Sequence, residues 1–173
     1  RRAGEGEPAP RPPPGPKLVP ASVPAASPIS RLRVCDVNND GWPDLLLVSA
    51  NGRSLRLLAG AGPCTFRDVT AASGLSRLTA EVADIATGDL DGDGDEDIVV
   101  QTRDRGPLLW RNDGGNQRHW LNLRLVGRKV NRSGYGATIE VAASGLYQKQ
   151  TLREGTAHFG LGPLTNVDVV RVT

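Results

Sequence analysis

The chain has 173 residues, of which 38% are hydrophobic and 4% aromatic, with 21 glycines and a formal net charge of +2. This length suits one domain or two small ones, and the composition predicts a turn-rich architecture with an aliphatic core. The small net charge gives no reason to expect a nucleic-acid partner, and no run approaches the roughly 18 apolar residues of a membrane span.

Residues 1–28 are proline-rich, and we expect them to form a disordered linker. Nine of the 13 prolines lie here, with almost no large apolar residues, so the segment buries too little surface to offset its ordering entropy. Arg11-Pro12-Pro13-Pro14 could serve as an SH3-type ligand, but a plain linker is favoured. The sequence has no Met and no N-terminal hydrophobic stretch, from which we expect a processed or excised piece of a longer chain.

Residues 29–78 have the pattern of four short strands. Residues 31–34 alternate, 45–48 are a continuous apolar run, and 54–58 and 65–69 follow after turns. Asn51-Gly52 marks a tight hairpin turn. Residues 71–75 are expected to form a short helical turn that ends at glycine.

Residues 79–115 repeat this plan with expected strands at 81–87, 98–101 and 108–110. Short strands, regular turns and a period near 53 residues indicate β-propeller blades rather than helices. After residue 115 the pattern changes to a small β module at 116–173, in which 119–126 is an alternating strand. The predicted fold class is therefore all-β, with two blades followed by this module.

Residues 89–97 carry six acidic side chains in nine positions, with two glycines. Carboxylates about 4 Å apart repel by roughly 1 kcal/mol per pair in water, and by about 4 kcal/mol at an effective dielectric of 20. A glycine-bearing loop that crowds them favours a bound cation, and hard oxygen ligands suit Ca²⁺.

The same pattern occurs 53 residues earlier, at 36–44, and each copy leads into an apolar strand. A solvated acidic turn would explain one copy, whereas two copies favour metal binding. An EF-hand is excluded because its twelfth position, here Leu47 or Val100, must be Glu. The predicted ligands are the side chains of Asp36, Asn38, Asp40 and Asp44 with the carbonyl of Trp42, and those of Asp89, Asp91, Asp93 and Asp97 with the carbonyl of Asp95.

The two loops resemble the β-hairpin calcium loops of FG-GAP or VCBS repeats, and "CTFRDVTAASGL" (64–75) resembles the join between such blades. "GRKVNRSGYGATIEV" (127–141), "YQKQTLREG" (147–155) and "HFGLG" (158–162) resemble the ASPIC/UnbV domain of cartilage-acidic-protein-like proteins. The resemblance covers about residues 30–173. Two features depart from it: only Thr156-Ala157 separates "REG" from "HFGLG", and two blades are fewer than the four to eight of a closed propeller. A fragment of a larger propeller is therefore expected.

The resemblance implies an extracellular or cell-surface calcium-binding protein that serves adhesion or protein–protein contact, without catalysis. The alternative is a carbohydrate-binding accessory module or a glycan-active enzyme fragment that uses the acidic loops. No zinc pair, nucleophile elbow or phosphate loop occurs, and His119 and His158 are interpreted as ordinary strand histidines.

Three smaller features complete the sequence analysis. Asn131-Arg132-Ser133 is an N-glycosylation sequon that is usable in a eukaryotic secretory setting. The basic cluster Arg124, Arg128, Lys129 and Arg132 could contact a polyanion such as a sulfated glycan, although a solvated loop is favoured. Cys35 and Cys64 could form one disulfide or remain thiols, with free thiols slightly preferred.

Overall fold

The computed structural model describes residues 23, 28–114, 117–128, 131–153 and 155–173. The linker predicted at residues 1–28 lies almost wholly outside this range. Within it the chain is all-β, with four antiparallel sheets and very little helix, which confirms the all-β part of the predicted fold class. No helix in these ranges has the length and apolar character of a membrane span.

The first sheet contains four antiparallel strands in chain order: β1 (Ile29–Cys35), β2 (Asp44–Ser49), β3 (Leu55–Gly62) and β4 (Thr65–Asp68). These are the strands that the alternation and turn signals predicted. The turn expected at residues 71–75 is also present: the N–H of Ser73 donates to the carbonyl of Val69 and that of Gly74 to the carbonyl of Ala71, and the turn ends at Gly74 with φ 79°. The 3₁₀ helix η1 (Leu75–Arg77) follows it directly.

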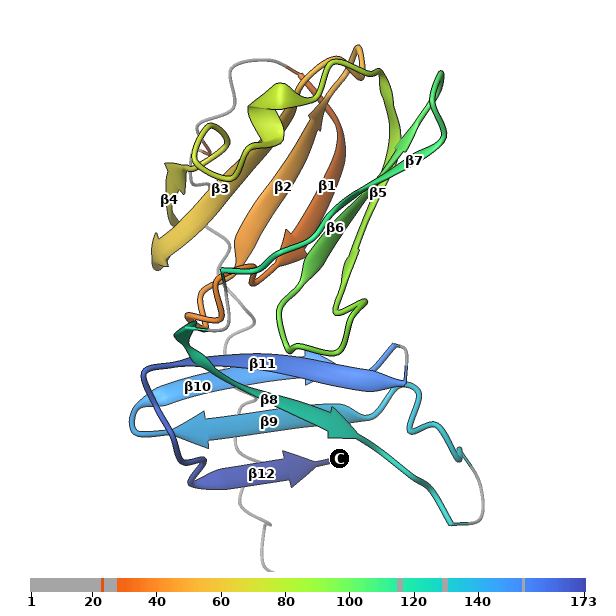
Figure 1. Ribbon diagram of the computed structural model, residues 1–173. Coiled ribbons are helices and arrows are strands. Elements are labelled where there is room, and N and C mark those ends of the chain that lie inside the picture. Colours follow the sequence, from red (N-terminus) through yellow and green to blue (C-terminus); the bar gives the residue numbers. More distant parts are fainter. Residues whose placement is uncertain (1–22, 24–27, 115–116, 129–130, 154) are drawn as a thin grey trace, which may run out of the picture.

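The second sheet has three strands, again in chain order: β5 (Val82–Gly88), β6 (Asp97–Thr102) and β7 (Pro107–Trp110). It lies beside the first sheet (Figure 1), and β1 is the strand of the first sheet that contacts β5. The two sheets repeat one hairpin plan, since β1–β2 and β5–β6 pair in the same way on either side of an acidic loop. No closed ring of sheets is formed by the described residues.

One hydrophobic core joins the two sheets. The first sheet contributes Cys35, Leu46, Val48, Leu55 and Leu57, and the second contributes Val82, Ile85, Ile98 and Val100. All nine are at most 6% exposed. Burying a Val, Leu or Ile side chain stabilises the folded state by about 1.5–3 kcal/mol, so this shared core fixes the two hairpins, and their loops, relative to each other.

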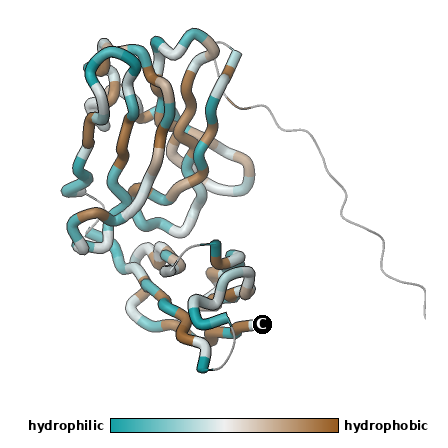
Figure 2. The backbone as a smooth tube through the Cα atoms, turned by 90° about the vertical axis from the view of Figure 1, so that its right-hand side faces the viewer, coloured by the Kyte–Doolittle hydropathy of each residue, from teal (hydrophilic) through white to brown (hydrophobic). Residues whose placement is uncertain are grey.

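The C-terminal module, residues 117–173, packs below these sheets (Figure 1). It is built from β8 (His119–Arg124), β9 (Thr138–Ala143), β10 (Leu146–Thr151), β11 (Thr156–Gly162) and β12 (Val169–Val172), as a β10-β9-β12 sheet and a β11-β8 pair. Phe159 and Ile139 are fully buried at the centre of its own core. Figure 2 shows hydrophobic stretches along the strands of both parts and hydrophilic stretches in the loops between them.

The two cysteines are both free thiols. Cys35 lies in the shared core at 6% exposure, where burial raises the pKa of its thiol strongly. Cys64 is exposed in the turn between β3 and β4. The slight preference for free thiols therefore agrees with the structure.

Candidate metal centres

Both acidic loops connect the first two strands of a sheet. Loop 1 (residues 36–44) joins β1 to β2, and loop 2 (residues 89–97) joins β5 to β6. Each loop has a glycine at its sixth position, Gly41 with φ 83° and Gly94 with φ 93°. This left-handed conformation is accessible to glycine at little cost, and it folds each loop back so that alternate side chains converge.

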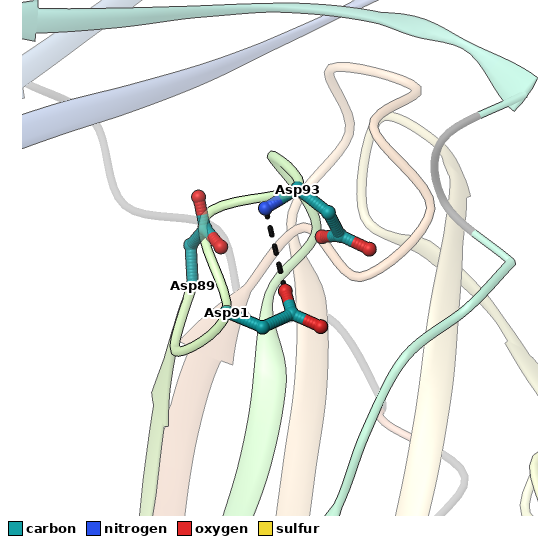
Figure 3. Close-up of side chains that lie close together, drawn as sticks. All are labelled: Asp89, Asp91 and Asp93. Atoms are coloured by element: carbon teal, nitrogen blue, oxygen red, sulfur yellow. Dashed lines mark hydrogen bonds between the residues drawn. The ribbon is translucent and has the colours of Figure 1, made fainter.

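Loop 2 brings three of its predicted ligands together. Asp89, Asp91 and Asp93 each offer a carboxylate oxygen, and these three oxygens lie within 4.8 Å of one another. Figure 3 shows the three side chains close together on this loop, where the backbone N–H of Asp93 donates to Oδ1 of Asp91 at 3.3 Å. The N–H groups of Gly92 and Gly94 donate to Asp89. The turn therefore orients carboxylates around a small space that suits a hard cation.

Loop 1 has the same internal hydrogen bonds. Asp36 accepts from the N–H of Gly41 at 2.8 Å, and Asn38 Oδ1 accepts from the N–H of Asp40 at 3.0 Å. Asp40 Oδ1 in turn accepts from the N–H of Trp42 at 2.8 Å, as Asp93 does from the N–H of Asp95 at 2.9 Å. The two loops thus share one fold, but loop 1 offers two carboxylates and an amide where loop 2 offers three carboxylates.

The ninth residues, Asp44 and Asp97, lie at the base of the loops. Asp44 is 0% exposed and accepts from the N–H groups of Val37 (2.9 Å) and Gly60 (2.7 Å). Asp97 is 1% exposed and accepts from the N–H groups of Leu90 (3.0 Å) and Asn112 (2.8 Å). Each carboxylate therefore fastens the start of its loop to the third strand region, and the carboxylate cluster of loop 2 forms without Asp97.

The seventh residues were predicted to ligate through their carbonyl groups. Trp42 is 40% exposed, and its N–H caps Asp40 as described. Asp95 is 0% exposed, and its side chain accepts from the amide of Asn39 at 2.9 Å. The carbonyl ligands stay a prediction, and the buried Asp95 side chain has a separate role in joining the two loops.

Burial makes the acidic charge of loop 1 costly in the absence of a cation. It raises the pKa of Asp36 to about 7, against the opposing N–H bond from Gly41, and it raises the pKa of Asp44 to about 6. The pKa of Glu96, which accepts from the N–H of Asp36 at 3.3 Å, is raised for the same reason. A bound divalent cation would remove this penalty, so the oxygen-only donor set fits Ca²⁺.

Two arginines supply part of the missing positive charge. Arg118 Nη1 lies 3.0 Å from Oδ2 of Asp40 in loop 1, and Arg111 Nη1 lies 3.9 Å from Oδ2 of Asp91 in loop 2. The closer contact is therefore in loop 1, where an incoming cation would compete with Arg118 for the same carboxylate.

Asn39 connects loop 1 to both of its neighbours, a role that sequence reasoning missed. Its Nδ2 donates to the carbonyl of Gly94 (3.2 Å) and to Asp95 Oδ1 (2.9 Å) in loop 2. Its Oδ1 lies 2.6 Å from Nε2 of His158 on β11. The one available signal was that Asn39 stands where loop 2 has Gly92, since both residue types tolerate the left-handed conformation.

The C-terminal module also packs tightly against the loops. A Cβ added to Gly94 would lie 1.8 Å from the ring of Trp120, and one added to Gly160 would lie 2.1 Å from Oδ2 of Asp36. Trp120 stacks on His158 with ring centroids 6.1 Å apart. His158 is therefore a contact residue between module and loops rather than an isolated strand histidine, whereas His119 is exposed on β8.

The remaining predicted sites lie outside this region. Asn131 is exposed with φ 51°, and its side-chain amide donates to the carbonyl of Tyr135 at 2.9 Å. In the basic cluster, Arg124, Arg128 and Arg132 are exposed, and Lys129 lies outside the described residues.

A cleft of about 490 Å³ opens beside loop 1. It lies between the first sheet, loop 2 and β10, and its lining includes Trp42, Glu96, Tyr147 and Gln148. Its lining also includes Asp36, so the cleft reaches one of the predicted ligands of loop 1.

Comparison with known proteins supports the repeat assignment. No curated protein matches this chain. The FG-GAP-like repeat family matches residues 36–100, which run from the first residue of loop 1 into β6 and so include both acidic loops. The chain therefore contains an FG-GAP-like repeat region at residues 36–100, within a β-rich repeat architecture.

Proposed function

We propose that this chain is a calcium-binding, non-enzymatic β-repeat protein of the extracellular space or cell surface, which serves adhesion or protein–protein contact. The observation that carries the proposal is the duplication of one loop. Two segments 53 residues apart form matching hydrogen bonds to the side chains at their first, third, fifth and ninth positions, which carry the predicted ligands. FG-GAP-like repeats often occur in proteins that bind other proteins, which supports the proposed role.

In this proposal Asp89, Asp91 and Asp93 hold calcium in loop 2, and Asp36, Asn38 and Asp40 hold it in loop 1. The carbonyls of Asp95 and Trp42 complete the backbone positions. The ion neutralises carboxylates that otherwise repel one another, and it clamps the β5–β6 and β1–β2 hairpins. Sites of the extracellular class bind calcium at about 10⁻⁴–10⁻³ M, which suits a setting where calcium is abundant.

We further propose that the C-terminal module is of the ASPIC/UnbV type and that the two sheets are part of a longer propeller. The face that the second sheet turns to the first contains Val82 and Ile85, at 4% and 3% exposure. Their counterparts 53 residues earlier, Ile29 and Leu32, lie on the free face of the first sheet at 37% and 55% exposure. The same contact can therefore be made once more, with a further sheet of the same kind.

The cleft beside loop 1 favours a second candidate function, glycan binding. Trp42 offers an exposed aromatic ring at its edge, and Glu96 and Gln148 offer polar groups. Sugars bind on aromatic platforms with a few placed hydrogen-bonding groups. Glycan-array binding that is lost in Trp42→Ala would support this candidate, and turnover of a glycan would favour the enzyme-fragment alternative.

Calorimetry of the whole chain tests the main proposal. A ligand at 100 times its dissociation constant stabilises by about 2.7 kcal/mol, and 1 kcal/mol shifts the melting temperature of a domain of this size by about 2–4 °C. About 10 mM Ca²⁺, which is roughly 10–100 times the dissociation constant of such sites, should therefore raise the melting temperature by several degrees over EDTA, while Mg²⁺ at equal concentration should raise it less. Superimposable curves in Ca²⁺ and EDTA would refute calcium binding.

A further inference from the structure

The left-handed backbone conformation of Asn39 does not by itself require an asparagine at this position of the loop. It is the fourth residue of loop 1 with φ 54°, and the fourth residue of loop 2 is Gly92 with φ 83°. A Cβ added at Gly92 would meet no atom within 4 Å, so that position of the repeat is open. Asn39, by contrast, is 0% exposed. Its side chain therefore serves something other than the shape of its own loop.

The polar groups of Asn39 are directed to three parts of the molecule. The amide NH₂ donates into loop 2, at Gly94 and Asp95. The amide oxygen faces Nε2 of His158 on β11, and the backbone carbonyl accepts from the N–H of Gly162 at 2.7 Å. The two contacts to loop 2 are buried and the contact to His158 is partly buried, and a buried polar group that loses its partner costs about 1–3 kcal/mol. Loss of one partner therefore carries a clear cost at Asn39.

The contact between the two loops lies next to predicted ligands on both sides. Asn38 and Asp40 flank Asn39 in loop 1, and Gly94 follows Asp93 in loop 2. An ion that fixes Asn38 and Asp40 also fixes the backbone of Asn39, which aims its amide at loop 2. The contact between the loops is then already ordered when the second ion binds, so the second ion does not bear that free-energy cost. This gives positive coupling between the two calcium sites.

We propose that Asn39 is a positioning residue that couples the two loops to each other and to the C-terminal module. Calcium in one loop thereby strengthens binding in the other and holds β11 against loop 1. This inference rests on the proposed calcium binding, but it makes a separate claim, because Asn39 is not itself a ligand.

A double-mutant cycle on the full chain tests the coupling between loops. Calorimetric titration measures the calcium affinity of loop 2 with and without Asp40→Ala, which disables loop 1. In the wild-type background this change should lower the calcium affinity of loop 2 by about fivefold or more, which is the lower end of typical coupling between sites. In the Asn39→Gly background it should have no effect. Gly matches the residue of loop 2 at this position, so Asn39→Gly keeps the loop conformation and removes only the amide. Asn131→Gly is the matched control, because Asn131 is also an asparagine with positive φ, at 51°, but lies outside both loops, and it should leave both affinities unchanged.

Hydrogen exchange tests the coupling to the module. The amide of Gly162 should exchange more slowly in Ca²⁺ than in EDTA, and this difference should disappear in Asn39→Gly. Asn39→Gly removes the coupling and should therefore lower the calcium affinity of loop 2 on its own. His158→Ala should lower that affinity in the same way. His158→Gln, which retains a donor toward the Asn39 oxygen, should restore much of the affinity, a rescue that a purely steric role would not give.

The possible outcomes separate the two proposals. Wild-type protein that binds no calcium would overturn the proposed function and the coupling with it. Wild-type protein that binds calcium, but in which Asp40→Ala changes loop 2 equally with and without Asn39, would overturn the coupling alone. Loss of the Asp40→Ala effect in Asn39→Gly, together with the change in Gly162 exchange, would support the coupling.

Discussion

The carboxylate of Asp97 accepts a hydrogen bond from the backbone N–H of Asn112 at 2.8 Å, which fastens loop 2 to the chain that follows β7. The same carboxylate accepts from the N–H of Leu90 at 3.0 Å, and it is 1% exposed. Asp44 binds Val37 and Gly60 in the same way in loop 1. The ninth loop residue therefore stabilises the fold whether or not it also contacts an ion.

Replacing Asp97 should consequently destabilise the protein even without calcium. Asp97→Ala leaves two backbone donors unpaired at about 1–3 kcal/mol each, a total of roughly 2–6 kcal/mol. Urea unfolding in EDTA should show this loss. Asp91→Ala is the matched control, because Asp91 is exposed in the same loop; it should change stability only in Ca²⁺. Equal losses for both variants in EDTA would contradict a structural role for Asp97.

Loop 2 should bind calcium more tightly than loop 1. Its cluster has three carboxylates, whereas loop 1 has Asn38 in the middle position and an arginine 3.0 Å from Asp40. One more carboxylate beside a divalent ion is worth a few kcal/mol even at an effective dielectric of about 20, whereas the extra loop glycine costs roughly 1 kcal/mol or less. Calorimetric titration should show that Asp93→Ala removes the tighter site and Asp40→Ala the weaker one. The reverse order would mean that the rigidity of the loop affects calcium affinity more than the charge of its ligands does.

Gly94 should tolerate a methyl group far less well than Gly92. Both have positive φ, at 93° and 83°, so an alanine at either position must adopt the left-handed conformation, which costs about 1–2 kcal/mol. Only at position 94 would the new Cβ overlap the ring of Trp120. Gly94→Ala should therefore unfold at distinctly lower urea than Gly92→Ala, and its Trp emission should change. Matching unfolding midpoints would show that the module does not rest on loop 2 in solution.

The free face of the first sheet should make the isolated chain self-associate. Leu32 and Val34 are 55% and 58% exposed on the same face of β1, and exposed apolar sheet faces promote association. Sedimentation in Ca²⁺ should detect oligomers that Leu32→Lys abolishes. Leu90→Lys is the control, because Leu90 is equally exposed, at 59%, but lies in loop 2. A wild-type monomer with one cooperative melt would contradict this interpretation of the face.

Asp68 should make the fold sensitive to acid. Hydrogen bonds from Thr70 and Arg56 lower its pKa to about 2 in the folded state, below the value of about 3.9 in an unfolded chain. Its stabilising contribution is therefore complete above pH 4 and is lost as the pH falls toward 2. The stability difference between wild type and Asp68→Asn should shrink from pH 5 to pH 2. The effect should be small, because the Asp68 side chain is 40% exposed. A difference that is constant with pH would exclude the ionised carboxylate as its source.

The sequence predicted local structure well because local signals determine it. Alternation at 31–34, the apolar run at 45–48 and the glycines of the acidic loops are each sufficient to specify a strand or a turn. Gly74 ends the turn before it as predicted, whereas the separate 3₁₀ helix η1 that follows was not predicted. The role of Asn39 was unpredictable for another reason: His158 lies 119 residues further along the chain, and no periodicity relates them.

The contrast between the two cysteines has a practical consequence. Cys35 is sealed in the core and its pKa is raised by burial, whereas Cys64 is exposed in a turn. Since the thiolate is the reactive species, a maleimide dye at neutral pH should attach at Cys64 alone. The unmodified chain therefore already has a single handle for fluorescence or for oriented attachment to a sensor surface, where calcium-dependent changes could be followed without an engineered cysteine.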